Sequence, residues 1–284
     1  MKLNEIISQT TDDNSLVVPT SISRLDEITG GLHIGHICTI AARPAMGKTS
    51  FAVTVLKNVG IKNKVPTAFL SMENSERGIA NRLVAAEFGW ESDSCPEGLS
   101  HDDAAKISMM QKIGFETNEQ CKEKYIQLMK EAPVWIEYNL IMSMDEVVGR
   151  MERLKQEKNV SVIIIDGLDW ITYGTSLEDG ELAMMKLAQA AEKLHVAILL
   201  TAGLTRDVED RIECIPMMGD LRKEFYTATY SSIVMFIYRP EYYGIREDDA
   251  GDTKDRAYIN IGKNNFGSVG SVYLRFTDHS RFEA

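Results

Sequence analysis

Short apolar segments alternate with longer segments of mixed polarity along most of the chain. Apolar and β-branched runs predict strands at residues 36–41, 65–72, 134–138, 160–166, 196–201 and 232–238. Apolar residues at helical spacing predict helices at residues 50–58, 144–158 and 181–194. Gly60 is predicted to end the first of these helices, and Asn74 and Ser75 are suitable N-caps for a further helix through IANRLVAAEFG. This alternation predicts an α/β fold with a mostly parallel central sheet covered by helices on both faces.

The two ends of the chain and its middle differ from this rhythm. Residues 1–20 are polar and turn-rich, so we predict an arm or linker there and one large domain over residues 21–284. Residues 90–132 are polar and methionine-rich and have helical character without strand character. Short strands over residues 257–261 and 272–276, joined by glycine-rich turns, predict antiparallel strands at the C-terminal edge of the sheet.

Composition limits the classes of function. Acidic residues outnumber basic residues by 42 to 31, and the net charge of −11 argues against a protein that coats nucleic acid with its whole surface. It leaves room for a narrow basic channel. The four cysteines are far apart and the five histidines lack metal-ligand spacing, so we expect reduced thiols in a cytoplasmic protein. No apolar run approaches the length of a membrane span.

The stretch AARPAMGKTS, residues 41–50, joins a predicted strand to a predicted helix. Backbone N–H groups in such a loop and at the start of its helix point at phosphate oxygens. Lys48 would neutralise the β- and γ-phosphates of a nucleotide, and the Thr49 hydroxyl would ligate Mg²⁺. Ala42 stands where the usual motif has its first glycine. The strand before the loop and the helix after it nevertheless favour a triphosphate site.

Two carboxylates follow predicted strands. Asp166 ends VSVIIID, and the carboxyl edge of a central strand lies near the phosphate loop in doubly wound folds. There it would hold a Mg²⁺-bound water. Glu73 ends VPTAFLSME and could polarise an attacking water. On spacing alone, Glu73 is equally well a surface residue in the first turn of the next helix.

Basic residues in the second half of the chain give weaker indications. Lys263 lies in INIGKNNFGSVG, which predicts a glycine-flanked turn between strands. Arg206, Arg211 and Arg222 lie in TRDVEDRIECIPMMGDLRKE, where acidic residues alternate with the arginines. The segment therefore predicts either DNA-facing loops or a solvated surface.

Short motifs in a fixed order span the chain from about Ser21 to Glu283. They are SRLDEITGGLHIG, AARPAMGKTSFA, FLSMENS, VIIIDGLDWI, LTRDVEDR, GDLRKE, VMFIYRPEYY and VYLRFTDHSRFE. Together they resemble the ATPase domain of the ring-shaped, DnaB-type bacterial replicative helicases, which has a RecA-like P-loop NTPase fold. Ala42 fits this resemblance, because the family often has Ala-Arg-Pro at that point.

The resemblance implies roles for particular residues. Lys48 corresponds to the phosphate-loop lysine, Thr49 and Asp166 to the Mg²⁺ site, and Glu73 to the catalytic glutamate. Lys263 corresponds to a lysine that reaches the γ-phosphate held by a neighbouring subunit. The implied nucleotide-binding residues are Ala42, Arg43, Pro44, Ala45, Met46, Gly47, Lys48, Thr49, Ser50 and Arg239. The implied DNA-binding residues are Arg206 and Arg222.

The chain departs from the family pattern at several points. Asn265 stands where the family usually has an arginine finger, and Gly203 where it has a sensor glutamine. After Arg222 the family usually continues Glu-Ser-Gly, whereas this chain has Lys-Glu-Phe at residues 223–225. We also expect the N-terminal collar domain of the replicative enzymes to be absent. We therefore expect a divergent relative with slow hydrolysis.

The function implied by the resemblance is an ATP-dependent, Mg²⁺-requiring helicase or translocase. It would be a hexameric homo-oligomeric ring that moves on single-stranded DNA, with a loader or a primase-like protein as partner and no membrane association. The alternative is an ATP-binding ring or loader module with weak or no unwinding. A RadA-type recombination ATPase is a third hypothesis, because KNNFG is close to the Lys-Asn-Arg-Phe-Gly motif of those proteins. It is weaker than the other two, because no zinc-binding cysteine cluster precedes the domain.

Overall fold

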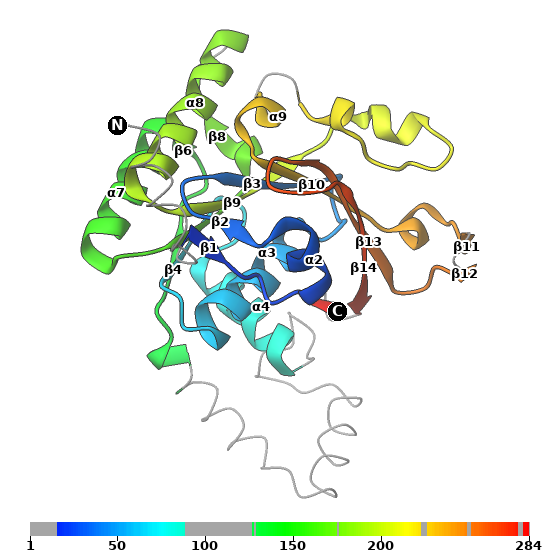
Figure 1. Ribbon diagram of the computed structural model, residues 1–284, viewed down its shortest axis with the longest axis horizontal. Helices are drawn as coiled ribbons and strands as arrows, with labels where there is room; N and C mark the ends of the chain where they lie inside the picture. The colour runs from blue at the N-terminus through cyan, green and yellow to red at the C-terminus, as the bar shows by residue number, and fades with distance from the viewer. Residues whose placement is uncertain are drawn as a thin grey trace, which may run out of the picture.

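The central sheet of the computed structural model contains both parallel and antiparallel strands. The structure describes residues 16–88, 127, 129–174, 176–222, 226–248, 251–277 and 281–283. Within these residues the strands of the sheet are β3 (Ile37–Ala42), β4 (Thr67–Ser71), β5 (Val134–Tyr138), β7 (Val162–Asp166), β9 (Ala197–Gly203), β10 (Ile233–Tyr238), β13 (Arg256–Asn264), β14 (Gly270–Thr277) and β15 (Arg281–Glu283). Their order across the sheet is β15-β14-β13-β10-β3-β9-β7-β4-β5. The strands from β10 to β5 are parallel, and β13, β14 and β15 form an antiparallel edge (Figure 1).

Helices cover both faces of the sheet, as the alternation of strands and helices predicts. The longer ones are α3 (Lys48–Leu56), α4 (Glu76–Phe88), α7 (Met144–Lys158) and α8 (Leu177–Leu194), and α2 (Ser23–Thr29) and α9 (Thr227–Tyr230) are short. Side chains of β7 show how the two layers form. Val162 and Ile164 pack in the cluster that contains α3 and α4, whereas Ile163 and Ile165 pack in the cluster that contains α7 and α8. A strand buried on both faces must be apolar throughout, which explains the continuous apolar run.

Small elements complete the described part of the chain. The two-residue strands pair as β1 (Val17–Val18) with β2 (Leu32–His33), β6 (Met142–Ser143) with β8 (Ile171–Thr172), and β11 (Glu247–Asp248) with β12 (Gly251–Asp252). The 3₁₀ turns are η3 (Leu168–Trp170), η4 (Arg206–Asp210), η5 (Met218–Asp220) and η7 (Pro240–Tyr243). Residues 1–15 of the predicted arm and most of the predicted helical stretch 90–132 lie outside the described residues.

The structure confirms the α/β class and the antiparallel edge but changes several element boundaries. Helix α8 begins at Leu177 rather than 181, because Ser176 and Asp179 form a capping box before its first turn. The prediction that Gly60 ends a helix is wrong. After α3 the chain continues as the π-helical turn η2 (Lys57–Lys62), and Gly60 lies inside it. A Cβ atom at this position would lie 2.5 Å from Cγ2 of Val134, so the glycine allows η2 to approach β5.

Two cysteines lie within the described residues. Neither Cys38 nor Cys214 is in a disulfide. Cys38 is buried in β3, and this burial raises the pKa of its thiol to about 12. Among the described helices, none combines the length and the apolar character that a membrane span requires.

The packing of Gly60 predicts a specific effect on stability. Gly60→Ala forces a methyl group against Val134 and should lower the free energy of unfolding by about 1–3 kcal/mol, the usual effect of overpacking. Gly149→Ala is the matched control, because Gly149 is exposed in α7 with no atom within 4 Å of an added Cβ. The control should gain up to about 1 kcal/mol from helix propensity. Urea unfolding followed by circular dichroism measures both, and equal stability of Gly60→Ala and the parent chain would contradict the packing argument.

Candidate functional site

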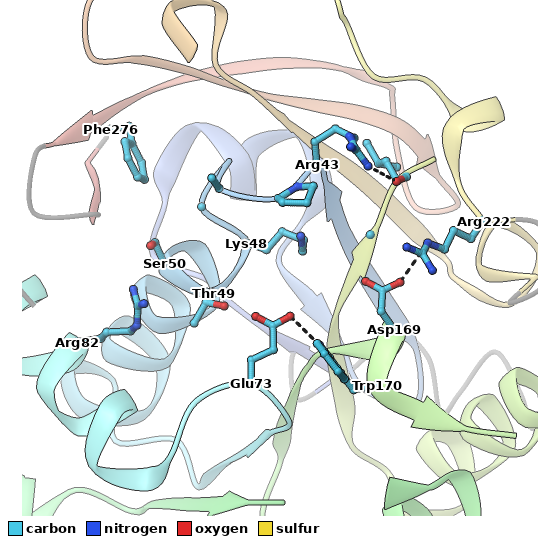
Figure 2. A pocket seen from close by; sticks show the side chains of 15 residues that line it. Arg43, Lys48, Thr49, Ser50, Glu73, Arg82, Asp169, Trp170, Arg222 and Phe276 are labelled. Atoms are coloured by element: carbon cyan, nitrogen blue, oxygen red, sulfur yellow. Dashed lines mark hydrogen bonds and ion pairs between the residues drawn. The ribbon is translucent and has the colours of Figure 1, made fainter. Parts of the chain in front are cut away.

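A cavity of about 690 Å³ lies at the carboxyl ends of the parallel strands, where β3 turns into α3 (Figure 2). The loop between them begins after Ala42 and ends at Gly47, the N-cap of α3. Ala45 and Gly47 have positive φ angles of 62° and 101°. A Cβ atom on Gly47 would lie 2.9 Å from Cε2 of Phe276 in β14. Glycine is therefore needed at position 47 both for its backbone angle and for the close contact with the C-terminal strands.

Lys48 and Ser50, in the first turn of α3, and the loop residues Arg43, Pro44 and Ala45 all line the cavity. The Lys48 Nζ atom donates a hydrogen bond to the Ala42 carbonyl, at 3.2 Å. Burial lowers the pKa of this ammonium group, and three carboxylates of the site act against that shift, in the order Asp169, Glu73 and Asp166. A ligand that combines an anion with a bound cation would complement this site, because the ammonium of Lys48 attracts the anion and the carboxylates attract the cation.

Three predicted nucleotide-binding residues, Ala42, Met46 and Arg239, do not line the cavity. The side chains of Ala42 and Met46 are buried in the hydrophobic core between the sheet and α3. Any contribution of these two residues to ligand binding must therefore come from their backbone groups.

Asp166 ends β7 and joins three elements. Its two carboxylate oxygens accept hydrogen bonds from the hydroxyls of Thr49 in α3 and Thr201 in β9, both at 2.9 Å. Thr201 in turn accepts a hydrogen bond from the Gly167 N–H at 2.8 Å. Burial raises the pKa of Asp166 to about 6, although both hydroxyl donors favour its charged form.

The pair of Thr49 and Asp166 fits a Mg²⁺ site completed by a ligand. Hydroxyl and carboxylate oxygens suit this ion, which is usually held by one or two carboxylates together with substrate phosphates. Among the residues that the structure describes, no cluster of three or more His, Cys, Asp or Glu side chains offers a separate metal site.

Glu73 lies just after β4 and lines the same cavity. Its Oε1 atom accepts a hydrogen bond from the indole Nε1–H of Trp170 at 3.0 Å (Figure 2). The structure thus brings Glu73 together with Lys48 and Thr49, the residues with which the sequence associates it.

Arg43 and Arg239 hold the loop from two sides. Arg43 donates to Oε1 of Glu209 in η4 at 2.8 Å and to the Leu204 carbonyl at 3.0 Å. Arg239 reaches the Ala45 carbonyl at 3.4 Å, and its guanidinium lies 3.8 Å from the centre of the Phe276 ring. Burial lowers the pKa of Arg239.

The structure separates the predicted basic residues. The predicted turn between strands lies at residues 265–269, but Lys263 itself lies near the end of strand β13, so its predicted place in the turn is wrong. Its Nζ atom donates a hydrogen bond to the Ala228 carbonyl at 2.9 Å, and Lys263 does not line the cavity. Arg206 is exposed at the start of η4. Arg222, a predicted DNA contact, lines the cavity and pairs with Asp169 at 3.4 Å. Strand β13 ends at Asn264 and not at residue 261 as predicted, because its pairing with β10 continues beyond the apolar run.

Six cavity residues are not predicted as site residues from the sequence, although Gly203 stands at the sensor position of the family. They are Asp169, Trp170, Gly203, Leu204, Arg82 and Phe276. Asp169 and Trp170 could be anticipated only by knowing that a 3₁₀ turn follows Asp166. Phe276 is more than two hundred residues away from the loop in sequence, and only the placement of the antiparallel edge brings the two together.

Comparison with known proteins identifies the family. Residues 17–284 match the family model for the DnaB-like helicase C terminal domain. The chain belongs to this family. The replicative DNA helicase DnaB of Geobacillus stearothermophilus is 28% identical over 289 residues, covering 96% of this chain and 60% of that protein. DnaB of Buchnera aphidicola subsp. Baizongia pistaciae is 30% identical over 274 residues, covering 94% of this chain and 55% of that protein. The chain thus spans roughly three fifths of the length of these relatives.

Solved structures agree with the fold of the family. A solved structure of an ATPase domain has a TM-score of 0.80 and 23% identity, covering 99% of this chain and 98% of that one. A DnaB-like replicative helicase, described with its interactions with primase, has the same TM-score and identity and covers 100% of this chain and 67% of that one. These similarities confirm the predicted RecA-like architecture.

The contacts of Asp166 predict a pH-dependent loss of stability. Thr201→Val removes the donor to Asp166 and the acceptor of Gly167 N–H, which should cost about 1–3 kcal/mol at pH 8. Because the folded pKa of Asp166 is raised to about 6, this carboxylate already weakens the parent fold as the pH rises from about 4 through 6, and Thr201 limits that loss. The cost of the substitution should therefore be smaller at pH 4.5.

Urea unfolding in the presence of EDTA at the two pH values measures this cost. Thr172→Val is the matched control, since Thr172 is exposed and its hydroxyl lies 3.4 Å from the Met142 carbonyl. It should change stability by no more than about 0.5 kcal/mol. A cost for Thr201→Val that is independent of pH would show that Asp166 is not charged in the folded protein at pH 8.

Proposed function

We propose that the chain is an ATP-dependent DNA helicase or translocase of the hexameric ring type, which hydrolyses ATP to move on single-stranded DNA. The observation that carries this proposal is that Lys48, Thr49 and Glu73 line one cavity at the strand ends, with the buried carboxylate of Asp166 hydrogen-bonded to Thr49. The names of the relatives support DNA replication as its setting. The proposal places the protein in the cytoplasm with DNA.

Each residue has a distinct part in hydrolysis. The loop N–H groups and the start of α3 would bind the phosphates, and Lys48 would neutralise their charge. Thr49 would ligate Mg²⁺ directly and Asp166 through a bound water, and the ion would neutralise charge that develops between the β- and γ-phosphates. Glu73 would accept a proton from the attacking water or orient it. Arg239, beside Phe276 at the rim, would border the remainder of the nucleotide.

The positions of Lys263 and Asn265 support the proposed ring. Within the described residues, Lys263 and Asn265 lie outside the cavity of their own subunit, and Asn265 is exposed just after β13. For either residue to act on a nucleotide, that nucleotide would have to be held by a neighbouring subunit. We therefore assign Lys263 to the subunit interface of a homohexamer, where it would supply charge to the next γ-phosphate.

DNA would be bound by a small set of basic residues in the central hole, because the net charge of −11 opposes binding over the whole surface. Arg206, exposed at the start of η4, is the first candidate. Arg222 is the second, and to reach DNA it would have to leave the cavity and its ion pair with Asp169. The solved relative described with primase supports a primase-like partner, and a loader is the second partner that we propose. The alternative of an ATP-binding loader module without a motor is less well supported, since the relatives are named as replicative helicases.

Two substitutions separate nucleotide binding from hydrolysis. Lys48→Ala should lower the affinity for ATP–Mg²⁺ at least ~30-fold, because a buried positive charge next to the phosphates is lost. Glu73→Gln should bind ATP almost normally and hydrolyse it at least about 100-fold more slowly, because an amide cannot accept the proton of water. Calorimetry and steady-state turnover, each with and without single-stranded DNA, measure the two effects.

Lys62→Ala is the control for the loss of one positive charge, because Lys62 is exposed at the end of η2. It should leave both quantities unchanged. Turnover that is absent in the parent chain, with and without DNA, would exclude the motor and favour the loader module. Unchanged hydrolysis by Glu73→Gln would remove that residue from the catalytic site.

The absence of an arginine at position 265 predicts slow hydrolysis by the assembled parent chain. An arginine supplied from a neighbouring subunit can accelerate phosphoryl transfer by ~10³–10⁵, and a lysine lacks its planar fork. Asn265→Arg should therefore raise turnover at least tenfold at protein concentrations where rings form, and have little effect on monomers. Turnover measured against protein concentration, with the oligomeric state monitored, gives the comparison.

Ser268→Arg provides a matched control, because it adds the same charge to the same exposed turn. It should not change turnover. Brisk turnover by the parent chain with no gain in Asn265→Arg would place the finger elsewhere. If Lys263→Ala were also silent, the interface assignment of this strand would be wrong.

A further inference from the structure

The 3₁₀ turn η3 follows the strand that carries Asp166 and brings two adjacent side chains into the cavity. Gly167 has a φ angle of 119°, which turns the chain sharply after β7. Leu168 is buried with 1% of its surface exposed, so the turn is anchored in the core. Asp169 and Trp170 then line the cavity on the side of Glu73 and Arg222 (Figure 2).

Trp170 contacts Glu73 through the polar edge of its ring. The indole Nε1–H donates to Oε1 of Glu73 at 3.0 Å. Glu73 is exposed and has a long, flexible side chain, so without a partner its carboxylate would sample many positions. An indole N–H can only donate a hydrogen bond, and it does not lose its proton near neutral pH. It therefore fixes one oxygen of the carboxylate and leaves the other free to accept a proton from water.

The turn that carries Trp170 is held at its neighbouring residue as well. Asp169 Oδ1 lies 3.4 Å from the Arg222 Nε atom, and within the described part of the chain it is buried without a partner in hydrogen-bond geometry. Space for this carboxylate exists because residue 203 is glycine, where a Cβ atom would lie 2.5 Å from Asp169 Oδ2. The core contact of Leu168 and the ion pair of Asp169 both restrict the position of Trp170.

We propose that Trp170 is a positioning residue that holds the Glu73 carboxylate in the orientation needed for attack by water. The inference rests on the proposed function, since it assumes that Glu73 acts on the water. Trp170 itself need not touch the nucleotide. Its effect is confined to the chemical step and does not extend to phosphate binding, which depends on Lys48 and Thr49.

The test is the steady-state hydrolysis of ATP–Mg²⁺ with saturating single-stranded DNA. Trp170→Phe keeps the aromatic ring and removes the N–H donor. It should lower kcat about tenfold, the usual effect of losing a hydrogen bond to a charged group, and change KM less than threefold. Because Trp170 is 44% exposed, the substitution should leave the thermal unfolding midpoint within a few degrees of the parent value.

Trp135→Phe is the matched control, because Trp135 lies in β5 and does not line the cavity. It should leave kcat and KM unchanged. The decisive comparison is the double variant Trp170→Phe/Glu73→Gln, which should hydrolyse ATP at the rate of Glu73→Gln alone. With the carboxylate removed, the indole has nothing to orient, so the two effects should not multiply.

The outcomes separate this inference from the proposed function. If Glu73→Gln abolishes turnover but Trp170→Phe retains the parent kcat, or raises it, the positioning role is wrong and the motor stands. Multiplying effects in the double variant would likewise refute the positioning role, because they would mean that Trp170 acts independently of Glu73. If Glu73→Gln hydrolyses ATP as fast as the parent chain, the catalytic assignment itself fails.

Discussion

The buried carboxylate of Asp166 is the contact on which the geometry of the site depends. It ends β7, and its two oxygens accept the hydroxyls of Thr49 from α3 and Thr201 from β9. One side chain thereby fixes the first turn of the helix after the phosphate loop relative to two neighbouring strands. The cost of burying this carboxylate is seen in its raised pKa, and the two hydrogen bonds offset part of that cost. The position of the cavity at the carboxyl ends of the parallel strands follows from this arrangement.

The C-terminal antiparallel strands act on the same loop from the other side. Phe276 in β14 packs close to Gly47 and beneath the guanidinium of Arg239, which also reaches the Ala45 carbonyl. Phe282 in β15 packs edge-on against Phe51 of α3 and against Phe276. The last strands in the sequence therefore support a loop from the first part of the domain, and residues from both parts line the cavity.

Sequence patterns identify the parts of this structure that depend on local chemistry. The apolar run before Asp166 predicts a strand buried on both faces, and Gly47 before α3 with Lys48 at its start predicts the loop, because periodicity and backbone angles are properties of short segments. Gly60 shows where this reasoning fails: its role is set by Val134, which lies far away in sequence. Asp169, Trp170 and Arg222 enter the cavity for the same kind of reason, through a turn and a long-range ion pair. The extra length of β13 also depends on its pairing with β10 and β14.

The contact between Gly203 and Asp169 has a consequence for how such a site can vary. The carboxylate occupies the volume that any larger residue at position 203 would require, since the added Cβ would come within 2.5 Å of it. A side chain could be accommodated at 203 only if residue 169 first became smaller or turned away. The sizes of the residues at positions 169 and 203 are therefore coupled. A relative with a long residue at one of these positions should carry a compensating change at the other.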